Sequence, residues 1–163
     1  MMPLDAFRVC FGSFTWDDLV TGYDFGFLNP GEIQREAAGD GHAVQRLRAL
    51  EGEALKTFEA HLWAACAEAV GKTPRPGSSR WSEAQDRWRE AILREALSTD
   101  STTAQLAQSV ERLYDQVGCP EDMLSMLKPS QRWAGIPATV DPTAVQRFLD
   151  RSRGAARRYG AAS

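Results

Sequence analysis

The segment 14–33 carries start and stop signals for two helices within twenty residues, and this constrains the fold more than any other feature of the chain. Thr15 followed by Asp18 is the pattern of a capping box at a helix N-terminus. Gly22 can supply the left-handed backbone that often follows a helix, so the first helix is predicted to end there. Asn29 before Pro30 predicts the start of the second helix, which should end near residues 38–39. The segment is therefore predicted to form a short helical hairpin.

Helical spacing of apolar residues continues through most of the chain. A third short helix is predicted over about 40–50, and a longer one is indicated by a stripe that Gly71 closes, formed by Leu55, Phe58, Leu62, Cys66 and Ala69. The segment 73–79 is rich in proline and glycine and is predicted to be a loop. Later helices are predicted from about residue 79 and from residue 101. A brief helix is predicted after Gly118-Cys119-Pro120 as far as residue 127, and a last one from Asp141-Pro142 onward. Alternation typical of a strand is confined to about 7–11.

These patterns predict an all-α fold with about seven or eight helices, beginning with the short acidic hairpin. The chain has 163 residues, and this length suits a single compact helical domain over 1–163. The arginine-rich tail, about 151–163, is the candidate for a disordered segment.

Composition excludes several classes of protein. Hydrophobic residues make up 43% and charged residues 25% of the chain, which is typical of a globular protein in water. No apolar run approaches the ~18 residues that a membrane span needs, and the first residues lack the apolar core of a secretory signal. The three cysteines, Cys10, Cys66 and Cys119, are odd in number and widely spaced, which predicts reduced thiols and a cytoplasmic location.

The net charge of −3 is distributed unevenly. Residues 1–70 carry eleven acidic and five basic side chains, a balance of −6, so the remainder carries +3. Such polarity can steer a charged partner to one part of a molecule, although it also occurs as ordinary surface solvation.

A search for catalytic or cofactor chemistry finds no recognised motif. The two histidines, His42 and His61, have no partners at metal-ligand spacing, and no nucleophile elbow or phosphate-binding glycine loop is present. His61 is predicted to be a boundary residue bonded to a neighbour. The sequence therefore predicts no catalytic residue, no cofactor and no metal. Nucleic-acid binding through the C-terminal arginines is disfavoured because the pI of the chain is about 5.4.

The acidic, aromatic hairpin is the remaining candidate for a functional surface. Its carboxylates are expected to stay exposed and to meet a cationic protein partner; they are Asp17, Asp18, Asp24, Glu32 and Glu36. Charged patches of this kind contribute association rate and selectivity, while buried aromatic rings contribute affinity. The alternative is that the carboxylates serve as helix caps and that the aromatic rings pin the hairpin to the larger helices. The sequence leaves both open.

The hairpin also resembles the opening of a family of small bacterial proteins known only as a domain of unknown function. The resemblance lies in Thr15-Trp16-Asp17-Asp18, Gly22-Tyr23, Gly26-Phe27-Leu28, Pro30 and Glu32-Ile33. It extends over about 7–128 through a tryptophan-bearing helix at 81–97 and the run Cys119-Pro120-Glu121-Asp122-Met123. Some members are thought to be immunity proteins of polymorphic toxins, which implies a non-enzymatic cytoplasmic inhibitor that covers a toxin's active site.

Together these observations predict a non-enzymatic protein-binding domain that neutralises a toxin through its acidic N-terminal surface. A small helical enzyme or ligand-binding domain is the alternative, and a nucleic-acid adaptor acting through the last helix is a third. The partner's identity and the oligomeric state stay open.

Overall fold

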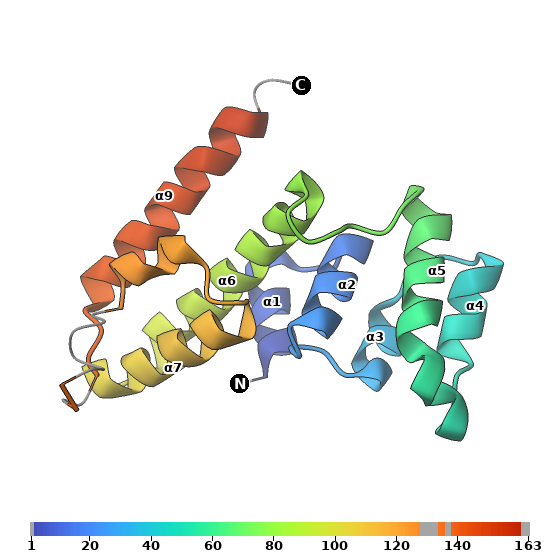
Figure 1. Ribbon diagram of the computed structural model, residues 1–163, viewed down its shortest axis with the longest axis horizontal. Helices are drawn as coiled ribbons and strands as arrows, with labels where there is room; N and C mark the ends of the chain where they lie inside the picture. Colours follow the sequence, from blue (N-terminus) through green and yellow to red (C-terminus); the bar gives the residue numbers. More distant parts are fainter. Residues whose placement is uncertain (1, 128–133, 136–137, 161–163) are drawn as a thin grey trace. The chain divides into compact units, whose positions relative to one another are not determined.

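The computed structural model describes residues 2–127, 134–135 and 138–160, with side chains of the last helix described as far as Arg153. Within these ranges the secondary structure consists of eight α-helices and two 3₁₀-helices, and no strand occurs (Figure 1). The predicted all-α class is confirmed. None of the described helices combines the length and the apolar character that crossing a membrane would require.

The chain divides into two compact units, residues 1–88 and 89–163, with helix α6 running through the boundary. The elements of the first unit are α1 (Pro3–Phe11), α2 (Trp16–Asp24), α3 (Pro30–Glu36), α4 (His42–Arg48), η1 (Gly52–Thr57), α5 (Phe58–Val70) and the first half of α6 (Ser79–Thr99). Those of the second are the rest of α6, α7 (Thr103–Gln116), η2 (Glu121–Ser125) and α9 (Pro142–Gly160).

Helix α5 lies between α2 and α4 in the first unit (Figure 1). It buries Phe58, Leu62 and Cys66, three members of the predicted stripe, whereas Leu55 precedes the helix in η1 and is partly exposed. Gly71 ends the helix as predicted, with a φ of 90° that suits a residue without a Cβ.

A second cluster in this unit is built from aromatic rings around Trp88. The indole is fully buried, with ring centroids 4.4 Å from Phe7, 5.2 Å from Phe27 and 5.9 Å from Phe14. Its Nε1–H donates a hydrogen bond of 2.9 Å to the backbone carbonyl of Asp18. The aromatic residues of the hairpin thus fold inward and join α6 to the hairpin.

Both predicted helix starts of the hairpin are confirmed. Thr15 and Asp18 form a reciprocal capping box, and Asn29 forms a second one with Glu32, ahead of Pro30 in the first turn. The third helix, predicted over about 40–50, is α4; it begins at His42 after Gly41, so Asp40 lies outside it.

The prediction that Gly22 ends the first helix is wrong. Helix α2 continues to Asp24, and the residue with a left-handed backbone is Gly26, whose φ is 74°. Gly22 is buried within the helix, where a Cβ would lie 2.5 Å from Cζ2 of Trp88. The glycine is therefore needed for close packing against the indole.

The strand-like alternation near 7–11 belongs to helix α1. Its residues Leu4 and Phe7 lie one helical turn apart and are buried, whereas Val9 is 81% exposed. The alternation was too short to distinguish the two periods.

In the second unit, Arg89 is buried beside α9 and η2. Its guanidinium lies 5.1 Å from the centroid of the Phe148 ring and 2.7 Å from a carboxylate oxygen of Asp122. Helix α9 begins at Pro142, as predicted, and Asp141 caps the backbone N–H of Thr143. Residues 151–160 of the predicted tail continue this helix, and 161–163 lie outside the described residues.

Candidate functional site

The first unit contains a groove of about 1100 Å³ formed by α2, α5, the loop 71–78 and the start of α6. Its apolar lining includes Val20, Tyr23, Trp63, Ala67, Pro74 and Trp81, and its charged lining includes Asp24, Glu59, Lys72, Arg75 and Arg80. The groove therefore combines aromatic and aliphatic surface with charges of both signs.

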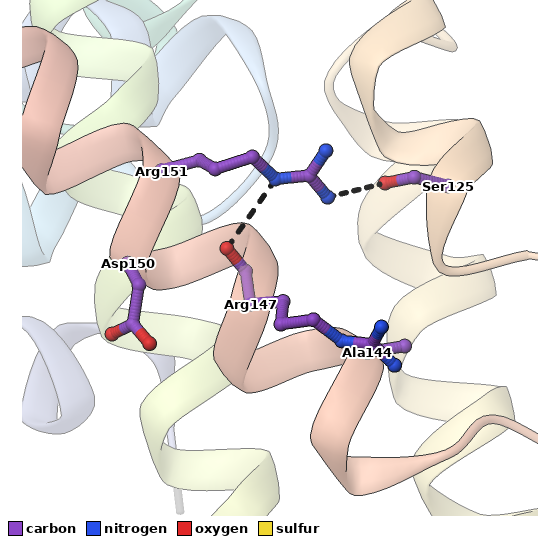
Figure 2. Close-up of a pocket in the computed structure, with 5 residues that line it drawn as sticks. All are labelled: Ser125, Ala144, Arg147, Asp150 and Arg151. Atoms are coloured by element: carbon purple, nitrogen blue, oxygen red, sulfur yellow. Dashed lines mark hydrogen bonds between the residues drawn. The ribbon is translucent and has the colours of Figure 1, made fainter.

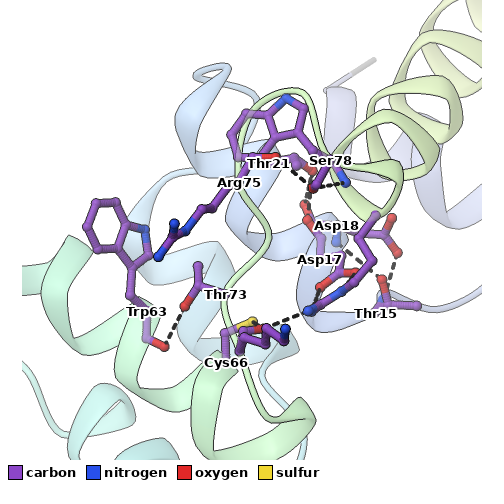
Figure 3. Close-up of polar contacts among 12 residues, drawn as sticks. Thr15, Asp17, Asp18, Thr21, Trp63, Cys66, Thr73, Arg75 and Ser78 are labelled. Carbon is purple, nitrogen blue, oxygen red and sulfur yellow. Dashed lines mark hydrogen bonds and ion pairs between the residues drawn. The ribbon is translucent and has the colours of Figure 1, made fainter.

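The walls of the groove are held in place by polar contacts that Figure 3 shows in part. The guanidinium of Arg80 donates two hydrogen bonds, of 2.8 and 2.5 Å, to the two carboxylate oxygens of Asp17. It donates a third, of 2.8 Å, to the backbone carbonyl of Lys72, and the Thr73 hydroxyl donates one of 3.2 Å to the carbonyl of Trp63. The hydrogen bonds to Asp17 raise the pKa of Arg80 above its ordinary value. The loop is thereby tied to both α2 and α5.

Helix α5 is unusual because its outward face carries more apolar than charged side chains. Its two charged side chains are Glu59 and Glu68, and Trp63 is 48% exposed and Val70 49% exposed. Ala60 and Ala64 are exposed on the same side. A helix that is apolar all round is normally covered on all sides in a folded protein. The outward face of α5 therefore has the character of a contact surface.

Four charged residues at the ends of the groove are exposed and form no ion pair within the part of the chain that the structure describes. Asp24 and Glu59 belong to one end, since their neighbours Tyr23 and Phe58 have ring centroids 5.3 Å apart. Lys72 and Arg75 follow the C-terminus of α5. The 13 residues of α5 span about 20 Å and separate Glu59 from Lys72. The groove therefore has an acidic end and a basic end.

In Figure 3 the Arg75 side chain reaches from the loop toward the Trp63 indole. Both residues line the groove. The groove is therefore lined by an unpaired cation as well as by a half-exposed indole.

The acidic surface predicted from the sequence is largely absent. Asp18 is 1% exposed and Glu32 8% exposed, and their carboxylates accept hydrogen bonds from the backbone N–H groups of the N-cap residues Thr15 and Asn29. The expectation that these two side chains are exposed is wrong. Both side chains take part in helix capping, which is the alternative that the sequence left open.

Asp17 and Glu36 are also held within the unit. The Asp17 side chain is 20% exposed and pairs with Arg80, and the Glu36 side chain is 15% exposed and pairs with Arg8. Asp24 alone of the five predicted residues is exposed, and it lines the groove. The other four carboxylates are occupied by caps and by arginines distant in sequence.

Sequence reasoning missed Trp63, the most prominent side chain of the groove. A signal was present, because Trp63 stands next to Leu62 but outside the stripe that Phe58, Leu62 and Cys66 form. A large aromatic residue off the buried stripe of a helix is a candidate for a contact residue.

Asp18 has an unusual electrostatic environment. Burial raises its pKa, while the backbone N–H of Thr15 and the guanidinium of Arg87, 3.2 Å away, act in the opposite direction. Its Oδ1 has no hydrogen-bond partner among the described residues. The neutral form of this side chain is therefore favoured in the folded protein relative to the unfolded chain.

We expect the stability contribution of Asp18 to be fully present below its ordinary pKa of 3.8 and to fall as pH rises from 3.8 through the folded-state pKa. The substitution Asp18→Asn removes this titration. Relative to the original protein, the Asp18→Asn protein should therefore gain free energy of unfolding as pH rises across this window. Urea denaturation at a series of pH values measures the difference. A gap that stays constant across the window would contradict the prediction.

The cysteine and histidine side chains near the groove give less indication of a functional site. Cys66 is fully buried, and burial raises the pKa of its thiol to about 11. The Nδ1 of His61 lies 2.9 Å from the carbonyl of Thr57, the neighbour contact that the sequence predicted. Among the described residues, no three His, Cys, Asp or Glu side chains are grouped closely enough to hold a metal ion.

The second unit has a smaller depression of about 520 Å³ between η2 and α9 (Figure 2). It is lined by Ser125, Arg147, Asp150 and Arg151, and an Nη of Arg151 donates a 3.3 Å hydrogen bond to the Ser125 hydroxyl. Asp150 brings a negative charge to the same lining, so the depression is not uniformly cationic.

Comparison with protein-family models, with curated proteins and with solved structures finds no match to this chain. The resemblance to a toxin-immunity family therefore stays a prediction, and the functional argument stands on the geometry of the groove.

Proposed function

We propose that this chain is a protein-binding domain and that the groove between α2, α5 and the loop 71–78 is its contact surface. The observation that carries the proposal is the half-exposed Trp63 on a helix whose outward face is apolar. Tryptophan is the residue type most enriched among side chains that dominate binding energy at protein interfaces.

The arrangement around Trp63 supports this role. Apolar surface around the indole can be excluded from water, while the unpaired charges at the ends of the groove can select a partner of complementary charge. The loop is fixed by the Arg80 and Thr73 hydrogen bonds, so little ordering would be needed when a partner binds.

The size of the groove favours a polypeptide over a small ligand. Sites for small molecules enclose roughly 300–1,000 Å³ and bury most of the ligand. This groove lies at the upper limit of that range at about 1100 Å³, and the principal aromatic side chain at its rim is half exposed instead of enclosed. A segment of another folded chain fits these dimensions better than an enclosed substrate.

Toxin neutralisation remains a prediction from the resemblance. If the partner is a toxin, the groove and its rim charges Asp24, Glu59, Lys72 and Arg75 are the surface that we propose for contact. The carboxylates of Asp17, Asp18, Glu32 and Glu36 would act indirectly, by holding the hairpin in place.

The proposal is tested by introducing a photo-crosslinking amino acid at Trp63 in the protein expressed in its native cells. Val9, which is 81% exposed on α1, provides the matched control position. We expect a discrete protein adduct from position 63 and none from position 9. The adduct is then identified by mass spectrometry, and its affinity for the purified protein should fall about 30-fold or more on Trp63→Ala. Equal labelling at the two positions, or no adduct at position 63, would refute the proposal.

A further inference from the structure

We infer that the partner for this groove is a second copy of the same chain, docked through an antiparallel pairing of the two α5 helices. This inference rests on the proposed function and assigns the partner. One end of the groove carries Asp24 and Glu59, and the other carries Lys72, while Arg75 on the following loop reaches toward Trp63. All four charged side chains are exposed and without ion pairs in the described ranges.

A surface that is acidic at one end and basic at the other is complementary to itself under a two-fold rotation. The rotation places the acidic end of each copy against the basic end of the other, and every contact occurs twice. A parallel pairing would instead bring acid against acid and base against base. The charge distribution therefore selects the antiparallel arrangement.

The register of the pairing follows from the sequence of α5. If Glu59 stands opposite Lys72 of the second copy, then Ala64 stands opposite Ala67 and Ala60 opposite Gly71. Small side chains would face one another along the centre of the contact, which permits close approach of the two helices. Each Trp63 would flank the two-fold axis, level with Glu68 of the other copy and next to the contact between Ala64 and Ala67. The antiparallel arrangement also sets the two helix dipoles against each other favourably.

Four of the residues in this register line the groove, and Ala60 and Ala64 are exposed on the same helix. The four are Glu59, Trp63, Ala67 and Lys72, and they face one continuous surface. Pairing would cover the apolar outward face of α5, including the exposed part of Trp63, which an isolated copy leaves in water. It would also neutralise the four rim charges.

The test uses two charge reversals, Glu59→Lys and Lys72→Glu, examined separately and as a mixture. In each single variant the two 59–72 contacts become repulsive, so sedimentation equilibrium should show dimerisation weakened about tenfold or more. When the two variants are mixed, one chain contributes lysine at both positions and the other glutamate. Both contacts are then attractive, and the mixture should form a heterodimer about as tightly as the original protein forms its homodimer.

Glu83→Lys provides the control, because Glu83 is exposed on α6 outside the groove and the change in net charge equals that of Glu59→Lys. It should leave dimerisation unchanged. A fluorescent label on one variant reports the heterodimer in the mixture, and circular dichroism verifies that each variant is folded.

A monomer at all concentrations up to about 0.5 mM, or a mixture that does not associate more tightly than its components, would overturn the inference. The proposed function is tested independently by the crosslink at Trp63. An adduct between two copies of the chain agrees with the inference. An adduct with a different protein at the same position would retain the proposed function and reject self-association.

Discussion

Replacing Trp88 with alanine is expected to lower the free energy of unfolding of residues 1–88 by about 3–5 kcal/mol. The indole is fully buried and is surrounded by the rings of Phe7, Phe14 and Phe27. Its removal would leave a cavity that rigid aromatic neighbours cannot fill, and the carbonyl of Asp18 would lose its hydrogen bond. Urea denaturation followed by far-ultraviolet circular dichroism measures the loss.

Trp63→Ala is the matched control, since it removes the same side chain from a half-exposed position. We expect it to cost about 1–2 kcal/mol, clearly less than Trp88→Ala, because about half of its surface is already in contact with water. Similar losses for the two variants would show that Trp88 is not the centre of the aromatic cluster.

The parts of the fold that the sequence predicted correctly depend on local chemistry. The boxes at Thr15 and Asn29, and the start at Asp141-Pro142, involve groups within three residues of each other. These hydrogen bonds depend on neighbouring residues and little on the tertiary structure. Three buried positions of α5, Phe58, Leu62 and Cys66, were also predicted from their helical spacing, whereas Ala69 of the same predicted stripe is exposed.

The candidate site was not predictable in this way, because its acids depend on distant residues. Arg80 lies 63 positions after Asp17, and the sequence gives no indication that the two would meet. An acidic cluster in a sequence therefore does not establish an acidic surface. In this chain the distant arginines neutralise Asp17, Asp18 and Glu36, and the charges left at the rim of the groove include two bases.

The character of the groove depends on the side chains of the outward face of α5. Helix α5 packs against α2 and α4 through its buried face. Its outward face also carries mostly apolar side chains. Sequence reasoning identified the stripe that is buried but treated the remaining residues as surface. Trp63 becomes informative only when the buried face is known.

Gly22 leads to a second prediction with a large effect, since the substitution Gly22→Ala should destabilise residues 1–88 by about 1–3 kcal/mol. In an ordinary helix interior this change would be stabilising by up to about 1 kcal/mol. Here the new Cβ would lie 2.5 Å from Cζ2 of Trp88 and 2.9 Å from Cδ1 of Leu28. The indole cannot move away freely because it is buried and its N–H is bonded to Asp18. Steric overlap therefore outweighs helix propensity.

A double-mutant cycle with Trp88→Phe isolates this overlap. Phenylalanine lacks the atom Cζ2 of the indole, so Gly22→Ala should cost less in the Trp88→Phe background than in the original protein. Additive losses would mean that the methyl group is accommodated by a shift of α2. A stabilised Gly22→Ala protein would mean that Gly22 does not pack against Trp88. The expected coupling free energy is about 1 kcal/mol or more. It arises because Gly22 and Trp88, 66 positions apart in the sequence, approach too closely for any side chain larger than hydrogen at position 22.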